Sequence, residues 1–252
     1  MSAPTVLPRI VLCVPGVFVP EIVAAIVGDL EFELQPRDAR VSNAFHAARS
    51  RRALDLPPVD PAVIERHATV AYVLSDPFTA DEAAATAHRM LRVGRALVSA
   101  GGLGVKCESS GIAHSREAWR RLCDECDDAL AVRPATGPSR YRFWGALFDA
   151  LVALPIIDEP DVYTCGMHLL GERDVVVDAR FAKSREGPGY ETRDLLAFAR
   201  YTLAESSVRA GQTFCADPNA PRFVIEHEAC RRYEEDDFFF NPYGYARLVA
   251  ME

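Results

Sequence analysis

The hydrophobic pattern between residues 67 and 115 predicts a strand, a helix and a second strand in succession. Val70–Leu74 is a run of apolar, β-branched and aromatic residues, which is typical of a buried strand. Thr79 and Glu82 have the spacing of a capping box, so a helix begins there. Gly101-Gly102 ends this helix, and Leu103–Cys107 follows as a strand. The apolar positions of the helix recur at helical spacing and predict one face against a sheet: Ala83, Ala84, Ala87, Met90, Leu91, Gly94, Leu97 and Val98.

The residues before this unit show the same order of elements. Arg9–Val14 predicts a buried strand, and Pro20–Leu30 predicts a helix with proline in its first turn. Glu31–Gln35 alternates charged and apolar residues, as a strand with one face in water does. Strand, helix, strand, strand, helix, strand is the order of a ferredoxin-like unit.

An inserted connection, Pro36–Arg66, separates the two halves of this unit. It contains three apolar residues that favour one short helix: Phe45, Ala48 and Leu54. We interpret the three arginines in its middle, Arg49, Arg51 and Arg52, as a solvated face rather than an anion site.

The second half is predicted as mixed α and β, with helices against a largely antiparallel sheet. Ser115 is an N-cap candidate for a helix that reaches about Asp128, with Trp119 and Leu122 as its buried anchors. The other expected helices are Phe143–Leu154 and Thr192–Glu205. The expected strands are Val162–Leu170, Asp174–Asp178, Gln212–Ala216, Phe223–Cys230 and Gly244–Met251.

Val132–Ser139 is rich in turn-forming residues and is the best internal boundary. We therefore expect an α+β protein in two parts. Residues 1–131 form a ferredoxin-like α/β half, and residues 140–252 form a second α+β half. The two halves are expected to form one globular body.

Composition narrows the class of protein. A chain of 252 residues with 49% hydrophobic residues can bury a core, and a net charge of −8 argues against nucleic acid as a partner. Seven scattered cysteines suit a reducing cytoplasm better than secretion. No apolar stretch approaches the ~20 residues that cross a bilayer, and the amino end lacks the charged region of a signal peptide. These observations predict a soluble cytoplasmic protein with no membrane partner.

Several short motifs together resemble an uncharacterised bacterial family, domain of unknown function 4261. The resemblance covers about residues 9–250, except that the Pro36–Arg66 insertion and the acidic segment near the end have no counterpart. It implies a similar fold and a bacterial origin, and it implies no reaction. The motifs that carry it are Pro20-Glu21, Ser109-Ser110-Gly111, His114-Ser115, Tyr163–Met167, Leu170-Gly171-Glu172 and Gly211-Gln212-Thr213.

A possible nucleophile and base follow the strand that ends at Cys107. A thiol or hydroxyl from Cys107, Ser109 or Ser110 near the His114 imidazole could form a catalytic pair, since sites of α/β proteins often open at strand ends. The alternative is that Cys107 is a small buried apolar residue and Ser110-Gly111 is a turn.

Three other groups have spacing that suggests chemistry, and each has a simpler explanation. Cys123 and Cys126 have zinc-ligand spacing, yet no second pair accompanies them. Glu226 and Glu228 share one face of a predicted strand, where a polar outer surface is the ordinary case. Lys183–Tyr190 has the glycines of an anion-binding loop and lacks the spacing of a P-loop. We assign no metal site and no cofactor.

Tyr233–Tyr245 combines four consecutive acids with six aromatic residues. Aromatic rings supply contact area and acids attract a basic partner, so this segment is the best candidate for recognition. The alternative is that Phe238 and Phe240 anchor a loop whose acids are only solvated. The predicted binding residues are Glu234, Glu235, Asp236, Asp237, Phe238, Phe239, Tyr243 and Tyr245.

Two functions remain open from the sequence. The first is a non-enzymatic interaction protein, such as an immunity-like or accessory protein, that binds a basic protein. The second is a small hydrolase or transferase that uses Cys107 and His114. Neither the reaction, the partner nor the oligomeric state follows from the sequence.

Overall fold

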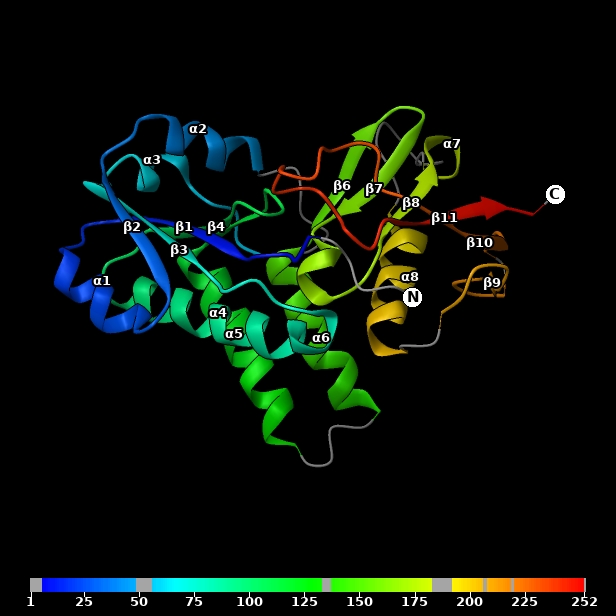
Figure 1. Ribbon diagram of the computed structural model, residues 1–252, viewed down its shortest axis with the longest axis horizontal. Coiled ribbons are helices and arrows are strands. Elements are labelled where there is room, and N and C mark those ends of the chain that lie inside the picture. The colour runs from blue at the N-terminus through cyan, green and yellow to red at the C-terminus, as the bar shows by residue number, and fades with distance from the viewer. Residues whose placement is uncertain are drawn as a thin grey trace.

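The computed structural model of the chain consists of two β-sheets with helices against them, an α+β architecture (Figure 1). The first sheet, sheet A, comes from the first half of the chain, and sheet B comes from the second half. The structure describes residues 6–48, 56–132, 137–182, 192–205, 208–218 and 220–251.

Sheet A has five strands in the order β2-β3-β1-β4-β5, and each neighbouring pair is antiparallel. Since β3 and β4 both pair with β1, one on each side, they run in the same direction, and helix α4 connects them. The sequence did not predict β5, which is only three residues long. The strands are β1 (Val11–Gly16), β2 (Glu31–Pro36), β3 (Thr69–Leu74), β4 (Gly104–Cys107) and β5 (Ala113–Ser115).

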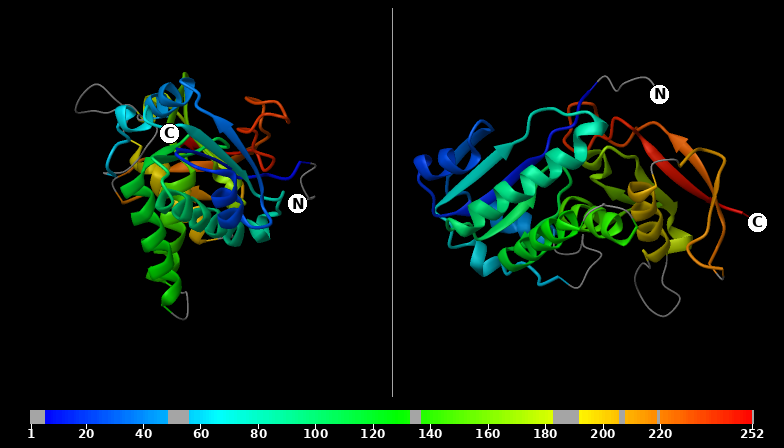
Figure 2. Two further views of the ribbon diagram at one scale, coloured as in Figure 1. Left: turned by 90° about the vertical axis from the view of Figure 1, so that its left-hand side faces the viewer. Right: turned by 90° about the horizontal axis from the view of Figure 1, so that it is seen from below.

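Helices cover both faces of sheet A, with the larger group on one face (Figures 1 and 2). The α4 helix begins after a 3₁₀ turn, η2 (Ala80–Glu82), which has the predicted capping box. Ala83, Met90 and Leu97 are fully buried, which confirms the predicted apolar face of α4. The larger group is α1 (Pro20–Val27), α4 (Ala83–Ser99) and α5 (Arg116–Ala131), and the smaller group is α2 (Arg40–Ala47) and α3 (Pro61–Ile64). Helix α6 (Pro138–Leu151) packs on α5.

The inserted connection covers the other face of sheet A. Phe45 of α2 is fully buried in a separate hydrophobic cluster that includes Cys13 and Val70 of the sheet. The helix expected around Phe45 is therefore confirmed. Four residues named in the sequence analysis lie outside the described residues: Arg49, Arg51, Arg52 and Leu54.

Sheet B has six strands in the order β6-β7-β8-β11-β10-β9. It consists of two antiparallel groups, β6-β7-β8 and β11-β10-β9, joined by parallel pairing of β8 with β11. Helix α8 (Arg193–Ala204) lies against one face (Figure 1). The strands are β6 (Ala153–Asp158), β7 (Asp161–Cys165), β8 (Asp174–Asp178), β9 (Thr213–Phe214), β10 (Phe223–Glu228) and β11 (Tyr245–Ala250), and a short helix α7 (Ala179–Ala182) follows β8.

Two expectations for the second half were wrong. The strand expected over Val162–Leu170 ends at Cys165, because Gly166 has a φ of 116° and a 3₁₀ turn, η3 (Met167–Leu170), follows it. Strand β6 was missed because Pro155 signalled only the end of a helix. A proline is tolerated there because β6 lies at the edge of the sheet and its pairing is irregular between Ala153 and Ile156.

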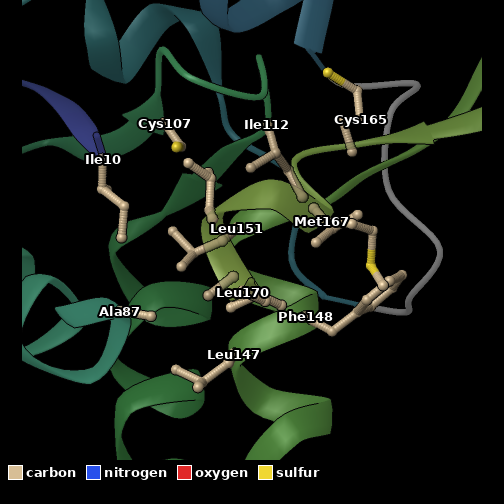
Figure 3. Packing of buried hydrophobic residues seen from close by; sticks show 14 of the residues in the cluster. Ile10, Ala87, Cys107, Ile112, Leu147, Phe148, Leu151, Cys165, Met167 and Leu170 are labelled. Atoms are coloured by element: carbon tan, nitrogen blue, oxygen red, sulfur yellow. The ribbon is translucent and has the colours of Figure 1, made fainter. Parts of the chain in front are cut away.

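One continuous hydrophobic cluster contains residues of both halves. Figure 3 shows Ile10, which directly precedes β1, and Cys107 of β4 in this cluster with Leu151 of α6 and Met167 of η3. The division of the chain near Val132–Ser139 stays a prediction, and residues 133–136 of it lie outside the described residues.

Candidate functional site

The acidic and aromatic residues lie on the connection between β10 and β11, on the opposite side of sheet B from α8 (Figure 1). Its middle consists of tight turns. The Asp237 N–H donates to the Glu234 carbonyl at 3.0 Å, and the Phe240 N–H donates to the Asp237 carbonyl at 3.0 Å. The Asp237 carboxylate accepts from the Phe239 N–H at 2.8 Å. The side chains of residues 234–238 are all exposed.

Contacts of aromatic rings hold this connection on the sheet. The Tyr233 hydroxyl forms a 2.7 Å hydrogen bond with the Tyr163 hydroxyl of β7. The Phe239 ring packs on Tyr233 at 5.5 Å between centroids and contacts the main hydrophobic cluster. The Arg232 guanidinium lies 4.8 Å from the centre of the Tyr163 ring, within cation–π distance.

The residues after the turns are held by a buried polar network. Asn241 is 1% exposed and donates through Nδ2 to Asp174 Oδ2 at 2.8 Å. Asp174 Oδ1 accepts from the Thr164 hydroxyl at 2.9 Å and from the Met167 N–H at 3.1 Å. The Asn241 side-chain oxygen accepts from the Tyr243 N–H at 2.9 Å. Burial raises the pKa of Asp174 to about 7, because solvent that would stabilise its charge is absent.

The predicted binding residues fall into two groups. Glu234, Glu235, Asp236, Asp237 and Phe238 are exposed, whereas Phe239 is half-buried. The other two residues, Tyr243 and Tyr245, are buried at 9% and 4% exposure. The expectation that Phe238 anchors the loop is wrong, since its side chain is 56% exposed. The anchors are instead Tyr233, Phe239 and Asn241.

Sequence reasoning missed an ion-pair network on the same face of sheet B. Arg247 of β11 donates to Asp161 at 2.9 and 3.0 Å and to Glu228 of β10 at 2.6 Å. Arg232 pairs with both Asp161 and Asp158. The hydrogen bonds from Arg247 are the main reason why the pKa of Asp161 is lowered. Because Asp161 and Arg247 are 86 residues apart, no local pattern could predict the pair.

Two grooves of about 560 and 620 Å³ lie beside this network. Both grooves are lined by four residues of the β10 end: His227, Glu228, Ala229 and Arg231. Glu226 is exposed, and the charge of the half-buried Glu228 is compensated by Arg247. Across the described ranges, no three His, Cys, Asp or Glu side chains are grouped so that they could hold a metal ion.

The structure brings Cys107 and His114 to one buried surface. Both side chains are fully buried, on the paired strands β4 and β5. His114 Nε2 lies 3.0 Å from the Ala150 carbonyl, and its ring contacts Trp119 at 5.6 Å. Burial raises the pKa of the Cys107 thiol to about 11, so the thiol is protonated near neutral pH. A nucleophilic cysteine needs the opposite shift, so this geometry favours a packing role.

We expect Cys107→Ala to lower the free energy of unfolding by about 1 kcal/mol and His114→Ala by about 2–3 kcal/mol, because both remove buried contacts. Urea unfolding of the two variants checks these values. Loss of a hydrolytic activity with unchanged stability would contradict the packing role and support the catalytic pair, which stays a prediction.

The remaining candidates from the sequence are the two cysteines with zinc-ligand spacing and the glycine-containing loop. Cys123 and Cys126 are buried on α5, and burial raises the pKa of both thiols to about 12. The Cys123 thiol donates to the Leu91 carbonyl at 3.4 Å, which is a packing contact. The loop Lys183–Tyr190 lies outside the described residues.

The chain matches no protein-family model, no curated protein and no solved structure. The resemblance to domain of unknown function 4261 therefore stays a prediction. None of the described helices combines the length and the apolar character that a membrane crossing requires.

Proposed function

We propose that this protein is a non-enzymatic interaction protein that binds a basic protein partner through Glu234–Phe238, which we name the acidic loop. The observation that carries the proposal is that the side chains of the acidic loop are exposed, whereas Asn241 and Asp174, which hold one end of it, are buried. Glu234, Glu235 and Asp236 form no ion pair with any residue in the part of the chain that the structure describes. Their charges are available to a partner.

The anchoring of the acidic loop supports recognition. A loop held at both ends loses little conformational freedom when it binds, which favours affinity. The Tyr233–Tyr163 hydrogen bond holds one end, and the Asn241–Asp174 hydrogen bond holds the other. Phe238, with 56% of its side chain exposed, adds an aromatic ring next to the acids. Rigid acids beside an aromatic ring suit a basic partner surface.

We also propose a ferredoxin-like fold for the first half of the chain. The support is the order β2-β3-β1-β4 with antiparallel neighbours, together with helices α1 and α4 after β1 and β3. The edge strand β5 is an addition to that topology.

A cytoplasmic location in a bacterium, with an immunity-like or accessory role, completes the proposal. All seven cysteines are free thiols, which suits a reducing compartment. The bacterial origin depends on the family resemblance.

The triple variant Glu234→Lys/Glu235→Lys/Asp236→Lys is expected to weaken binding of the native partner about tenfold or more, because three attractions become repulsions. Phe238→Ala is expected to cost about 1–2 kcal/mol of binding free energy. Affinity capture from the native host identifies the partner, and titration calorimetry with the purified partner measures both effects.

The matched control is Glu65→Lys/Asp76→Lys/Asp128→Lys, which changes the net charge equally at exposed acids elsewhere. It should retain the partner. If the two triple variants capture the same proteins in equal amounts, the acidic loop is not the binding site.

A further inference from the structure

Helix α1 is unusual because most of its apolar surface faces solvent. Its sequence, PEIVAAIV, has one charged residue, and only Val23 and Val27 are buried. Ile22 is 46% exposed, and the preceding Val17 and Val19 are 66% and 54% exposed. Ile22 and Ile26 are one helical turn apart on α1, and apolar residues that are exposed close together mark an interaction site more often than scattered ones do.

The apolar surface continues into a groove between α1 and α4. This groove has a volume of about 420 Å³ and is lined by Ile26 of α1 and by one side of α4. Its α4 side consists of Ala85, His88, Arg89, Arg92, Val93 and Ala96. Val17, Val19, Ile22 and this groove together form a face that we name the α1 face.

Two charges at the α1 face, Glu21 next to Ile22 and Arg92 of the groove, have opposite signs and no ion-pair partner among the described residues. Arg89 pairs with Asp29, and Arg95 pairs with Asp124 and Asp127. Glu21 and Arg92 are both exposed, and neither forms an ion pair with any residue in the described ranges. An apolar face with one unpaired acid and one unpaired base can be complementary to itself.

The positions of these charges match a twofold arrangement. Glu21 stands in the first turn of α1, whereas Arg92 lines the groove beside Ile26 in the last turn. If two α1 helices pack antiparallel, the first turn of one lies next to the last turn of the other. Each Glu21 then meets the Arg92 of the other copy, which is the reciprocal contact of a twofold interface.

We propose that the α1 face binds a second copy of this chain and forms a twofold dimer, with apolar contacts through Ile22 and Ile26 and reciprocal Glu21–Arg92 ion pairs. An eight-residue helix provides a small interface, so the dimer is weak, with a dissociation constant in the range of about 1–100 μM. The acidic loop lies over sheet B, away from α1 at the far end of sheet A (Figure 1), so the dimer leaves that loop open.

Sedimentation velocity of the full chain from about 1 μM to about 1 mM tests the dimer. We expect a concentration-dependent shift from monomer to dimer. Ile22→Glu should weaken the dimer at least about 30-fold, because it places a charge in the apolar contact. Val132→Glu is the matched control, since Val132 is also exposed and apolar but lies at the end of α5. Thermal unfolding shows whether both variants are folded.

Exchanging the charges of Glu21 and Arg92 tests whether these two residues pair across the dimer interface. Glu21→Arg alone and Arg92→Glu alone should each weaken the dimer about tenfold, because each places like charges together. The double variant Glu21→Arg/Arg92→Glu should restore the wild-type dissociation constant within about threefold. A chain that stays monomeric at every concentration overturns the proposal, as does a dimer that Ile22→Glu leaves intact or a double variant that remains as weak as the singles. None of these outcomes depends on partner binding by the acidic loop.

Discussion

Trp119→Ala is expected to lower the free energy of unfolding by about 3–5 kcal/mol, the range for a large aromatic residue removed from a core. Trp119 is fully buried, and its indole N–H donates to the Leu91 carbonyl of α4 at 3.1 Å. Its ring lies against Gly94, where a Cβ atom would come within 2.7 Å of the indole nitrogen. Trp119 therefore fills the space that Gly94 leaves between α4 and α5, and its loss opens a cavity.

A double-mutant cycle with Gly94→Ala tests this explanation. Gly94→Ala alone should destabilise the protein because its methyl group collides with the indole, although alanine is the better helix former. In the Trp119→Ala background the same change should be neutral or stabilising by up to about 1 kcal/mol, because the collision is gone. Denaturant unfolding of the four proteins gives the coupling energy. Additive effects would show that the two residues do not share the space.

Asp174→Ala is expected to cost about 3–5 kcal/mol, because each buried donor that loses its acceptor costs about 1–3 kcal/mol. The substitution leaves the Thr164 hydroxyl, the Met167 N–H and the Asn241 amide without their acceptor in a region closed to water. Since Asn241 holds one end of the acidic loop, the variant should also lose partner affinity. Unfolding in urea and calorimetric titration of the partner measure the two effects, and a fully stable variant would contradict this role.

The same carboxyl group predicts how stability depends on pH. The pKa of Asp174 is about 7 in the folded protein and 3.8 in an unperturbed chain. Between these values the folded state binds a proton that the unfolded state has lost, so the free energy of unfolding falls as pH rises. Burial raises the pKa of Glu172 to about 7 and that of Asp149 to about 6, which adds to the same trend.

One buried imidazole opposes this trend over part of the range. Burial lowers the pKa of His168 to about 4, so its contribution is lost as pH falls below the unfolded value of 6.5. Burial also lowers the pKa of His227, which opposes the trend in the same way. Three carboxyl groups outweigh these two imidazoles, because the window of Asp174 and Glu172 reaches to about pH 7, and the protein should be more stable near about pH 5.5 than near about pH 8. Asp174→Asn should reduce the slope by up to about 1.4 kcal/mol per pH unit. Urea unfolding at both pH values decides this, and higher stability at the alkaline value would contradict it.

Sequence signals that act over a few residues predicted where helices begin and which of their faces are buried. The capping box at Thr79 and the helical spacing through Leu97 predicted α4, and Ser115 does cap α5 by accepting from the Ala118 N–H at 3.2 Å. Apolar runs did not distinguish a strand from a 3₁₀ turn where every side chain is buried, because apolar and polar residues then no longer alternate with the period of either structure. Met167–Leu170 is buried throughout, so its 3₁₀ turn looked like a continuation of β7.

The candidate site was predictable only in its exposed part. Consecutive acids at 234–237 had to face water, since four adjacent charges cannot be buried without partners. The sequence could not show which neighbouring aromatic residue is inside. Phe238 is exposed whereas Phe239 packs on the core, and this choice depends on Tyr163 and Tyr233, far apart in the chain. The supports of the acidic loop are tertiary contacts, which no local pattern encodes.

The parallel contact between β8 and β11 sets a constraint on how the chain can fold during translation. Sheet A needs only residues up to Ser115, so its strands can pair while the ribosome is still adding the second half. Strand β8, in contrast, keeps an open edge until Tyr245–Ala250 has emerged, because β11 is its neighbour on that side. Open strand edges recruit other chains. The nascent protein is therefore most exposed to aggregation in the interval between the synthesis of β8 and that of β11.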